Sequence, residues 1–183
     1  MQGYGRFLTL FAAGSLVWLS ACVQHGKPLP DAKLEAQNRG RLEQLKGLEG
    51  TWTGTHRHEG QPKPVTVTYR VTAGGSAVME TIDPGTPMEM VTFYTLDAGN
   101  LVLTHYCMLG NQPTMVAQAS DRPNRIPFVF TGCGNLRSPE APHMHDATLT
   151  LVDDTHLKAE WTLYQDEKPQ APTGFELERA AGP

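Results

Sequence analysis

Three histidines and one cysteine have the chemistry of metal ligands, at spacings that could bring them together: His105, Cys107, His143 and His145. Side chains along a strand alternate between two faces, so His105 and Cys107 share one face of an apolar segment. His143 and His145 share a face of another. Imidazole and thiolate bind zinc, copper and haem iron, and a His-x-His pair can present two rings to one metal. The pattern therefore predicts a metal or haem site inside a sheet structure.

The alternative for each histidine is a local hydrogen bond or a solvated position. Neither C-x-x-C nor H-E-x-x-H accompanies the His-x-His pair in this sequence. His56 and His58 are expected to be solvated. Sequence alone leaves both interpretations of His105, His143 and His145 open.

Cys107 also has a partner for a disulfide. With Cys22 assigned to another role below, Cys107 and Cys133 are the remaining pair. A bridge between them closes a loop of about 25 residues and stabilises the fold by roughly 3–4 kcal/mol in the chain-entropy model. A disulfide cysteine cannot serve as a thiolate ligand, so these two hypotheses for Cys107 exclude each other.

Nucleophilic catalysis has weaker support. The sequence has no G-x-S-x-G elbow and no glycine-rich phosphate loop before a helix. Alternation places Asp146 on the face opposite His145, which separates a potential acid–base pair. Glu80, Glu89 and Glu160 are expected to lie on strands as exterior, solvated carboxylates.

The elements that must position these residues are short strands. From residue 51 onwards the hydrophobic period is two, and turn signals such as Asp83-Pro84-Gly85 interrupt it. We predict strands at residues 51–58, 64–72, 76–82, 88–96, 100–109, 113–119, 126–131, 145–153, 156–164 and 173–178. Such a meander removes its exposed edges by closing on itself. The sequence thus predicts an all-β, antiparallel barrel of about eight to ten strands.

A short helix is predicted before the barrel. Asp31 can cap it, leucines recur at roughly helical spacing, and it is expected to end near Gly47. Residues 22–30 have no period and contain two prolines, so they are predicted to be a tether. Residues 31–183 then form one domain. The net charge of −4, with no concentrated basic face, argues against a nucleic-acid partner.

The amino terminus has the features of a targeting signal. An apolar run over residues 7–19 follows Arg6 and is too short to span a membrane. It ends in Leu19-Ser20-Ala21-Cys22, which resembles the bacterial lipobox. The resemblance implies removal of residues 1–21 as a signal peptide and attachment of diacylglycerol and a further acyl chain, such as palmitate, to Cys22. Val23 resembles the residue of lipoproteins sorted to the outer membrane. An ordinary secretory signal is the alternative.

The segment Gly50-Thr51-Trp52, after the predicted helix, resembles the signature of the calycins, which include lipocalins, fatty-acid-binding proteins and nitrobindin-like haem proteins. In lipocalins this tryptophan closes one barrel end beneath an arginine of the last strand, and Arg179 has the matching position. Residues 71–80 and 103–107 are similar to segments of uncharacterised bacterial calycin-like proteins. The alternative is that Trp52 is a core aromatic of another β-fold.

The calycin resemblance implies a barrel that holds one small ligand, apolar or metal-containing. Haem has less support, because the proximal histidine of nitrobindin-like proteins lies near the carboxyl terminus and the last histidine here is His156. The first hypothesis is therefore a ligand-binding barrel, lipid-anchored in the bacterial envelope and facing the periplasm from the outer membrane. The second is an accessory protein with a filled barrel that contacts another protein through loops at 120–125 and 135–142. The third is a metal-dependent enzyme.

Overall fold

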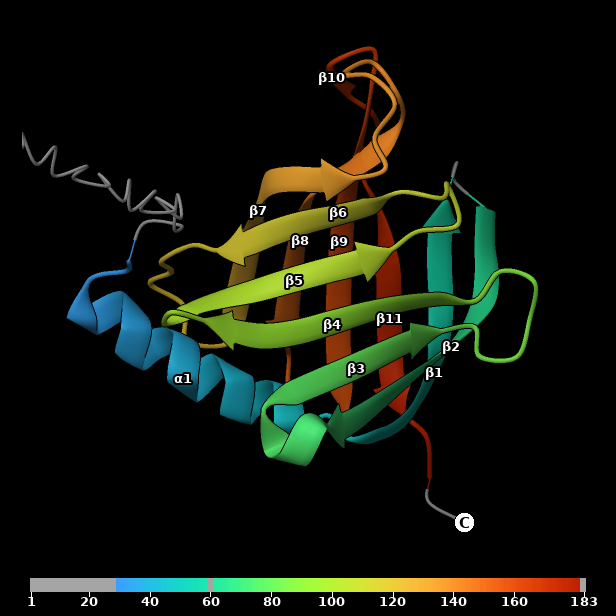
Figure 1. Ribbon diagram of the computed structural model, residues 1–183. Helices are drawn as coiled ribbons and strands as arrows, with labels where there is room; N and C mark the ends of the chain where they lie inside the picture. The colour runs from blue at the N-terminus through green and yellow to red at the C-terminus, as the bar shows by residue number, and fades with distance from the viewer. Residues whose placement is uncertain (1–28, 59–60, 182–183) are drawn as a thin grey trace, which may run out of the picture.

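The computed structural model describes residues 29–58 and 61–181. Within them, one helix, one short 3-10 turn and eleven strands follow along the chain (Figure 1). The elements are α1 (Ala32–Lys46), β1 (Gly50–His58), β2 (Gln61–Thr72), η1 (Ala73–Gly75), β3 (Ala77–Ile82), β4 (Met90–Asp97), β5 (Asn100–Tyr106), β6 (Gln112–Ala117), β7 (Arg125–Gly134), β8 (His143–Leu151), β9 (His156–Gln165), β10 (Lys168–Pro169) and β11 (Thr173–Arg179).

Ten of these strands form a closed antiparallel barrel. Each strand from β1 to β9 pairs with the next, and β11 pairs with both β9 and β1 to close the ring. The two-residue strand β10 pairs with β9 outside the ring. The predicted all-β barrel after a short helix is therefore confirmed. The ten long strands overlap the ten predicted ranges, and β10 is an addition.

Alternating residues of the barrel strands form one continuous core. Every strand of the ring contributes to it, as do Leu42 and Leu45 of α1. Its largest side chains include Trp52, Tyr94 and Phe128, each almost completely buried. Burial of this apolar surface is the main force that holds the ring together.

The seam that closes the barrel depends on two glycines. A Cβ atom on Gly54 of β1 would overlap the carbonyl oxygen of Glu176 in β11. A Cβ atom on Gly174 of β11 would likewise overlap the carbonyl oxygen of Ala159 in β9. Glycine therefore permits the close backbone approach that closure requires.

Helix α1 covers one end of the barrel (Figure 1). Its N-cap is Asp31, whose carboxylate accepts a backbone N–H at 2.8 Å, and its C-cap is Gly47, as predicted. Polar side chains of the helix hold the loops beneath it. Asn38 donates to the carbonyl of Gly99 at 3.1 Å, and Arg41 donates to the carbonyl of Gln118 at 2.8 Å.

The meander gives the barrel two ends with different turns. The α1 end has the connections β2–β3, β4–β5, β6–β7 and β8–β9. The opposite end, called the far end below, has the connections β1–β2, β3–β4, β5–β6, β7–β8 and β9–β11. His105 lies near the end of β5, Cys107 directly follows it, and His143 begins β8. All three therefore lie toward the far end.

Candidate functional site

A chain of buried hydrogen bonds lies inside the barrel and joins β2, β3, β4 and β5. The hydroxyls of Tyr69 and Tyr94 both donate to Glu80 Oε2, at 2.6 and 2.9 Å. The hydroxyl of Thr92 donates to Glu80 Oε1 at 3.2 Å. Thr92 Oγ1 also lies 2.9 Å from His105 Nδ1. All five residues are buried.

These contacts decide which nitrogen of His105 carries the proton. The Thr92 hydroxyl has a single hydrogen, which it gives to Glu80. His105 must therefore donate its Nδ1–H to Thr92 Oγ1. Nε2 then holds a lone pair, for which the described residues show no hydrogen-bond partner. An imidazole nitrogen with a lone pair can accept from a ligand with an O–H or N–H group, or bind a metal ion.

Burial shifts the pKa values of the residues joined by these hydrogen bonds. It lowers the pKa of His105 to about 4, so the ring is neutral at physiological pH. It raises the pKa of Glu80, while the bonds from Tyr69, Tyr94 and Thr92 partly offset that rise. The pKa values of Tyr69 and Tyr94 lie well above their ordinary value, mainly through burial, so both remain hydrogen-bond donors.

The placement of Glu80 corrects a sequence-based expectation. Glu80 was expected on the outside as a solvated carboxylate, but only 2% of its surface is exposed. The signal was present in the strand, because Glu80 has the same parity as the buried Val78 and Ile82. Tyr69, Thr92 and Tyr94 were not singled out either, and their inward parity would have found them by the same rule.

An aromatic side chain lies beside His105. The centroid of the His105 ring is 5.0 Å from that of the Trp161 ring on β9. Met115 on the adjacent strand β6 is fully buried, and Met90 at the start of β4 packs against the core. In the strand register Met115 pairs with Leu103 and Met90 pairs with Ile82, so the only ring contact of His105 among the described residues is the one with Trp161.

His143 and His145 lie together, but not as simple alternation predicts. The pairing of β8 with β9 shifts register between Met144 and Asp146, so His145 is the extra residue of a β-bulge. Met144 pairs with Leu163 and packs against the core, which is the position that alternation assigned to His145. The rings of His143 and His145 are 5.8 Å apart between centroids.

The structure describes no contact between His105 and either of these two histidines. His105 contacts Thr92 and Trp161, whereas His143 and His145 contact Phe130 and Tyr164. Among residues 29–58 and 61–181, no group of three or more His, Cys, Asp or Glu side chains is arranged to hold a metal. The three histidines therefore belong to two separate environments.

Cys107 and Cys133 are free thiols in the structure. Burial raises the pKa of Cys107, which disfavours the thiolate that a metal ligand requires. Burial also raises the pKa of Cys133, and the charge of a Cys107 thiolate raises it further. The disulfide between them stays a prediction.

Trp52 and Arg179 meet at the α1 end of the barrel. The guanidinium carbon of Arg179 lies 4.4 Å from the centroid of the indole ring, within the range of a cation–π contact. Arg179 also donates to the carbonyls of Glu49 and Gly47, at 2.9 and 2.7 Å. The indole N–H of Trp52 donates to the carbonyl of Leu48 at 2.8 Å. Trp52 and Arg179 are thus in contact, and their role as a lipocalin-like closure stays a prediction.

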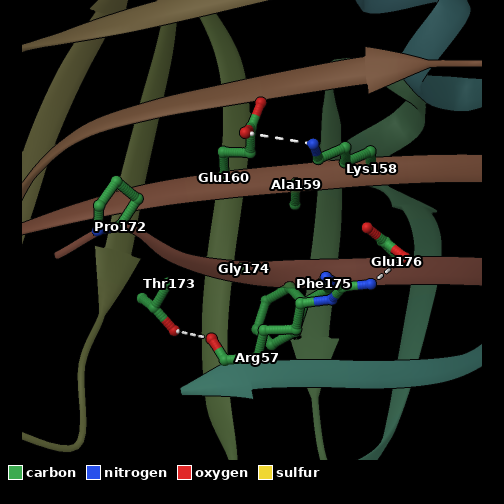
Figure 2. A pocket seen from close by; sticks show the side chains of 9 residues that line it. All are labelled: Arg57, Lys158, Ala159, Glu160, Pro172, Thr173, Gly174, Phe175 and Glu176. Atoms are coloured by element: carbon green, nitrogen blue, oxygen red, sulfur yellow. Dashed lines mark hydrogen bonds and ion pairs between the residues drawn. The ribbon is translucent and has the colours of Figure 1, made fainter. Parts of the chain in front are cut away.

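Two surface hollows lie away from the buried chain. One, of about 140 Å³, is on the outer face of the seam over Gly174, where Arg57 contacts Glu176 and Lys158 contacts Glu160 (Figure 2). The other, of about 680 Å³, lies at the α1 end between the helix and the β8–β9 turn and includes Arg179. Charged side chains of the first hollow pair with each other, so neither sign is left in excess.

The fold of this chain is similar to that of a solved structure, whereas two other comparisons found no match. No protein-family model matches the chain, and no curated protein is significantly similar to it. The crystal structure of Rv2717c from M. tuberculosis aligns with a TM-score of 0.53 at 17% identity, over 76% of this chain and 97% of that one. The likeness is one of fold alone.

A second solved structure is a protein of unknown function from the DUF3598 family of Nostoc punctiforme. It aligns with a TM-score of 0.49 at 13% identity, over 74% of this chain and 49% of that one. Neither comparison assigns a chemical role to any residue of this chain.

The residues present do not fit the haem site that the nitrobindin resemblance implies. The last histidine in the sequence, His156, begins β9 at the α1 end and is exposed. Its Nδ1 lies 2.9 Å from the carboxylate of Asp153. A late histidine that reaches the barrel interior is therefore missing from this chain.

The predicted signal peptide and the predicted lipidation site Cys22 lie outside the described residues, as does most of the predicted tether. In the part of the chain that the structure describes, no helix has the length and apolarity to cross a membrane.

Proposed function

We propose that this protein is a lipid-anchored envelope barrel that binds one small molecule against His105. The observation that carries the proposal is the buried chain Glu80–Thr92–His105, which orients the His105 ring through Nδ1 and leaves its Nε2 outside the hydrogen bonds of that chain. A carboxylate and an imidazole are costly to bury, and apolar side chains of similar size would fill the same space more cheaply. Perturbed titratable groups of this kind cluster at functional sites.

The surroundings define the class of ligand. Nε2 of a neutral imidazole accepts a hydrogen bond, so the ligand carries an O–H or N–H group. Trp161, whose ring lies beside that of His105, offers it aromatic contact. The ligand is therefore a small, mainly apolar molecule with one polar donor.

Native mass spectrometry of the full chain, extracted from membranes in mild detergent, tests this function. The wild type is expected to retain a small molecule that His105→Leu and Thr92→Val lose, because the first removes the acceptor and the second removes the group that orients it. Thr104→Val is the matched control, since Thr104 is a half-buried threonine next to His105 on the other face of β5. Equal retention by all variants, or no retained molecule in the wild type, would refute binding at His105.

The anchor has its own test. Cys22→Ser should abolish incorporation of radiolabelled fatty acid, because acylation requires the Cys22 sulfur. Equal labelling of wild type and variant would remove the lipoprotein part of the proposal.

A filled barrel that contacts another protein is the second candidate. It is favoured by three exposed apolar side chains, Tyr106 at the end of β5 and Met108 and Leu109 on the β5–β6 connection, which are 46–55% exposed. Exposed apolar groups that gather on one loop are a feature of contact surfaces. A wild-type protein free of small molecules, together with a partner lost on Met108→Ser, would favour this candidate over the first.

A further inference from the structure

A second site, separate from His105, is formed where β8 bulges at the far end of the barrel. His143 pairs with Tyr164, Met144 pairs with Leu163, and His145 is inserted before Asp146. The bulge keeps the rings of His143 and His145 as neighbours while Met144 fills the core position between them. Bulges often aim side chains at functional sites in this way.

Both rings are oriented through the same nitrogen. His143 Nδ1 lies 2.8 Å from the carbonyl oxygen of Ala141, and His145 Nδ1 lies 3.1 Å from Asp146 Oδ2. A carbonyl and a carboxylate only accept hydrogen bonds, so Nδ1 is the protonated nitrogen in each neutral ring. Nε2 then holds the lone pair. Metal-binding histidines characteristically donate their other N–H to a carbonyl or carboxylate.

Aromatic contacts hold the two rings in place. The ring of His145 stacks on Tyr164 at 3.9 Å and on Phe130 at 4.6 Å, with interplanar angles of 20° and 18°. His143 packs against Phe130 at 5.0 Å and is only 5% exposed. Rings held in this way lose little freedom when they bind an ion, which favours binding.

The separation of the rings suits one shared ion. A metal about 2.1 Å from each Nε2 lies roughly 3 Å from each ring centroid, so two rings on one metal are at most about 6 Å apart. The observed separation of 5.8 Å satisfies this limit. We propose that His143 and His145 bind one divalent copper ion through their Nε2 atoms.

The choice of copper follows from the ligands. Two imidazoles with no third metal-binding side chain among the described residues leave the remaining positions to water. Mixed nitrogen and oxygen ligands in a tetragonal arrangement suit Cu²⁺, which also binds such ligands more tightly than Ni²⁺ or Zn²⁺ does. Asp146 acts as a positioning residue, because it holds the His145 ring without contacting the ion.

Titration of the full chain with Cu²⁺, after alkylation of its thiols, tests the proposal. Electron paramagnetic resonance should show one bound ion with two equatorial imidazole nitrogens, and pulsed measurements should detect both remote nitrogens. His143→Ala and His145→Ala should each weaken binding about tenfold or more and leave a one-imidazole spectrum. Asp146→Asn should retain two imidazoles with an affinity that falls by about tenfold.

His156→Ala is the matched control. His156 is an exposed histidine whose Nδ1 also contacts a carboxylate, that of Asp153, but it has no histidine neighbour at ring distance among the described residues. Its loss should leave the high-affinity ion and the two-nitrogen spectrum unchanged. The proposal is overturned if the wild type shows only one imidazole, or if His156→Ala weakens binding as much as His143→Ala. Near-ultraviolet circular dichroism of every variant verifies that the barrel is intact.

Discussion

His105 is neutral in the folded barrel because its burial opposes a positive charge, which makes stability depend on pH. Burial lowers its pKa from 6.5 to about 4. Between these values the unfolded chain binds a proton at His105 and the folded protein does not, so the free energy of unfolding rises with pH across this window. We expect the wild type to lose roughly 3 kcal/mol more than His105→Gln as the pH falls from about 6.5 to about 4.

Urea unfolding of both proteins at several pH values measures this difference. Glu80 changes the free energy of unfolding in the opposite direction. Its pKa is raised in the folded protein, so above the ordinary pKa of glutamate the folded protein binds more protons at Glu80 than the unfolded chain does, and this contribution to stability falls as the pH rises. It is present in both proteins, so the comparison isolates His105. Parallel stability curves for wild type and His105→Gln would show that the imidazole is not shielded from water.

At the scale of single residues, sequence reasoning found His105 and missed its partners. A histidine is a candidate site residue because of its imidazole chemistry, whereas a glutamate in a strand is usually exposed to solvent. The inward position of Glu80 depends on register, which Val78 and Ile82 fix by their shared parity. The hydrogen bonds to Tyr69 and Tyr94 depend on the pairing of three strands, which the sequence does not state.

Among the elements, the close approach of β1 and β11 at Gly54 leads to a prediction about stability. Gly54→Ala should destabilise the barrel by about 1–3 kcal/mol or more, because its Cβ would overlap the Glu176 carbonyl and force the strands apart. Gly40→Ala is the control in the exposed face of α1, where a Cβ has nothing within 4 Å. It should stabilise the protein by about 0.5–1 kcal/mol. Equal effects of the two substitutions on thermal unfolding would contradict this account.

Strand positions could be predicted from the period of two, but the bulge in β8 could not. A bulge inserts one residue without changing the composition of the strand, so alternation counted through it assigns the wrong face. The error concerns Met144 and His145, which exchange the positions that simple alternation predicts. Helix α1 was easier to locate, since Asp31 and Gly47 mark its ends.

For the molecule as a whole, the contact between Trp52 and Arg179 joins the two ends of the domain. Trp52→Ala should cost about 3–5 kcal/mol, as expected for a fully buried large aromatic. Arg179→Ala should cost less, and its effect should shrink in the Trp52→Ala background because the guanidinium lies over the indole. Urea denaturation of the four proteins gives the coupling energy. Strictly additive losses would show that the cation–π contact adds no stability.

The closing pair of strands also determines when the protein can fold. β1 starts at Gly50 and its partner β11 starts at Thr173, so the ring cannot close until residues 173–179 have been synthesised. A nascent chain that lacks β11 leaves the edges of β1 and β9 without partners, and such edges promote aggregation. The late position of β11 in the sequence thus delays closure of the ring relative to formation of the other strand pairs.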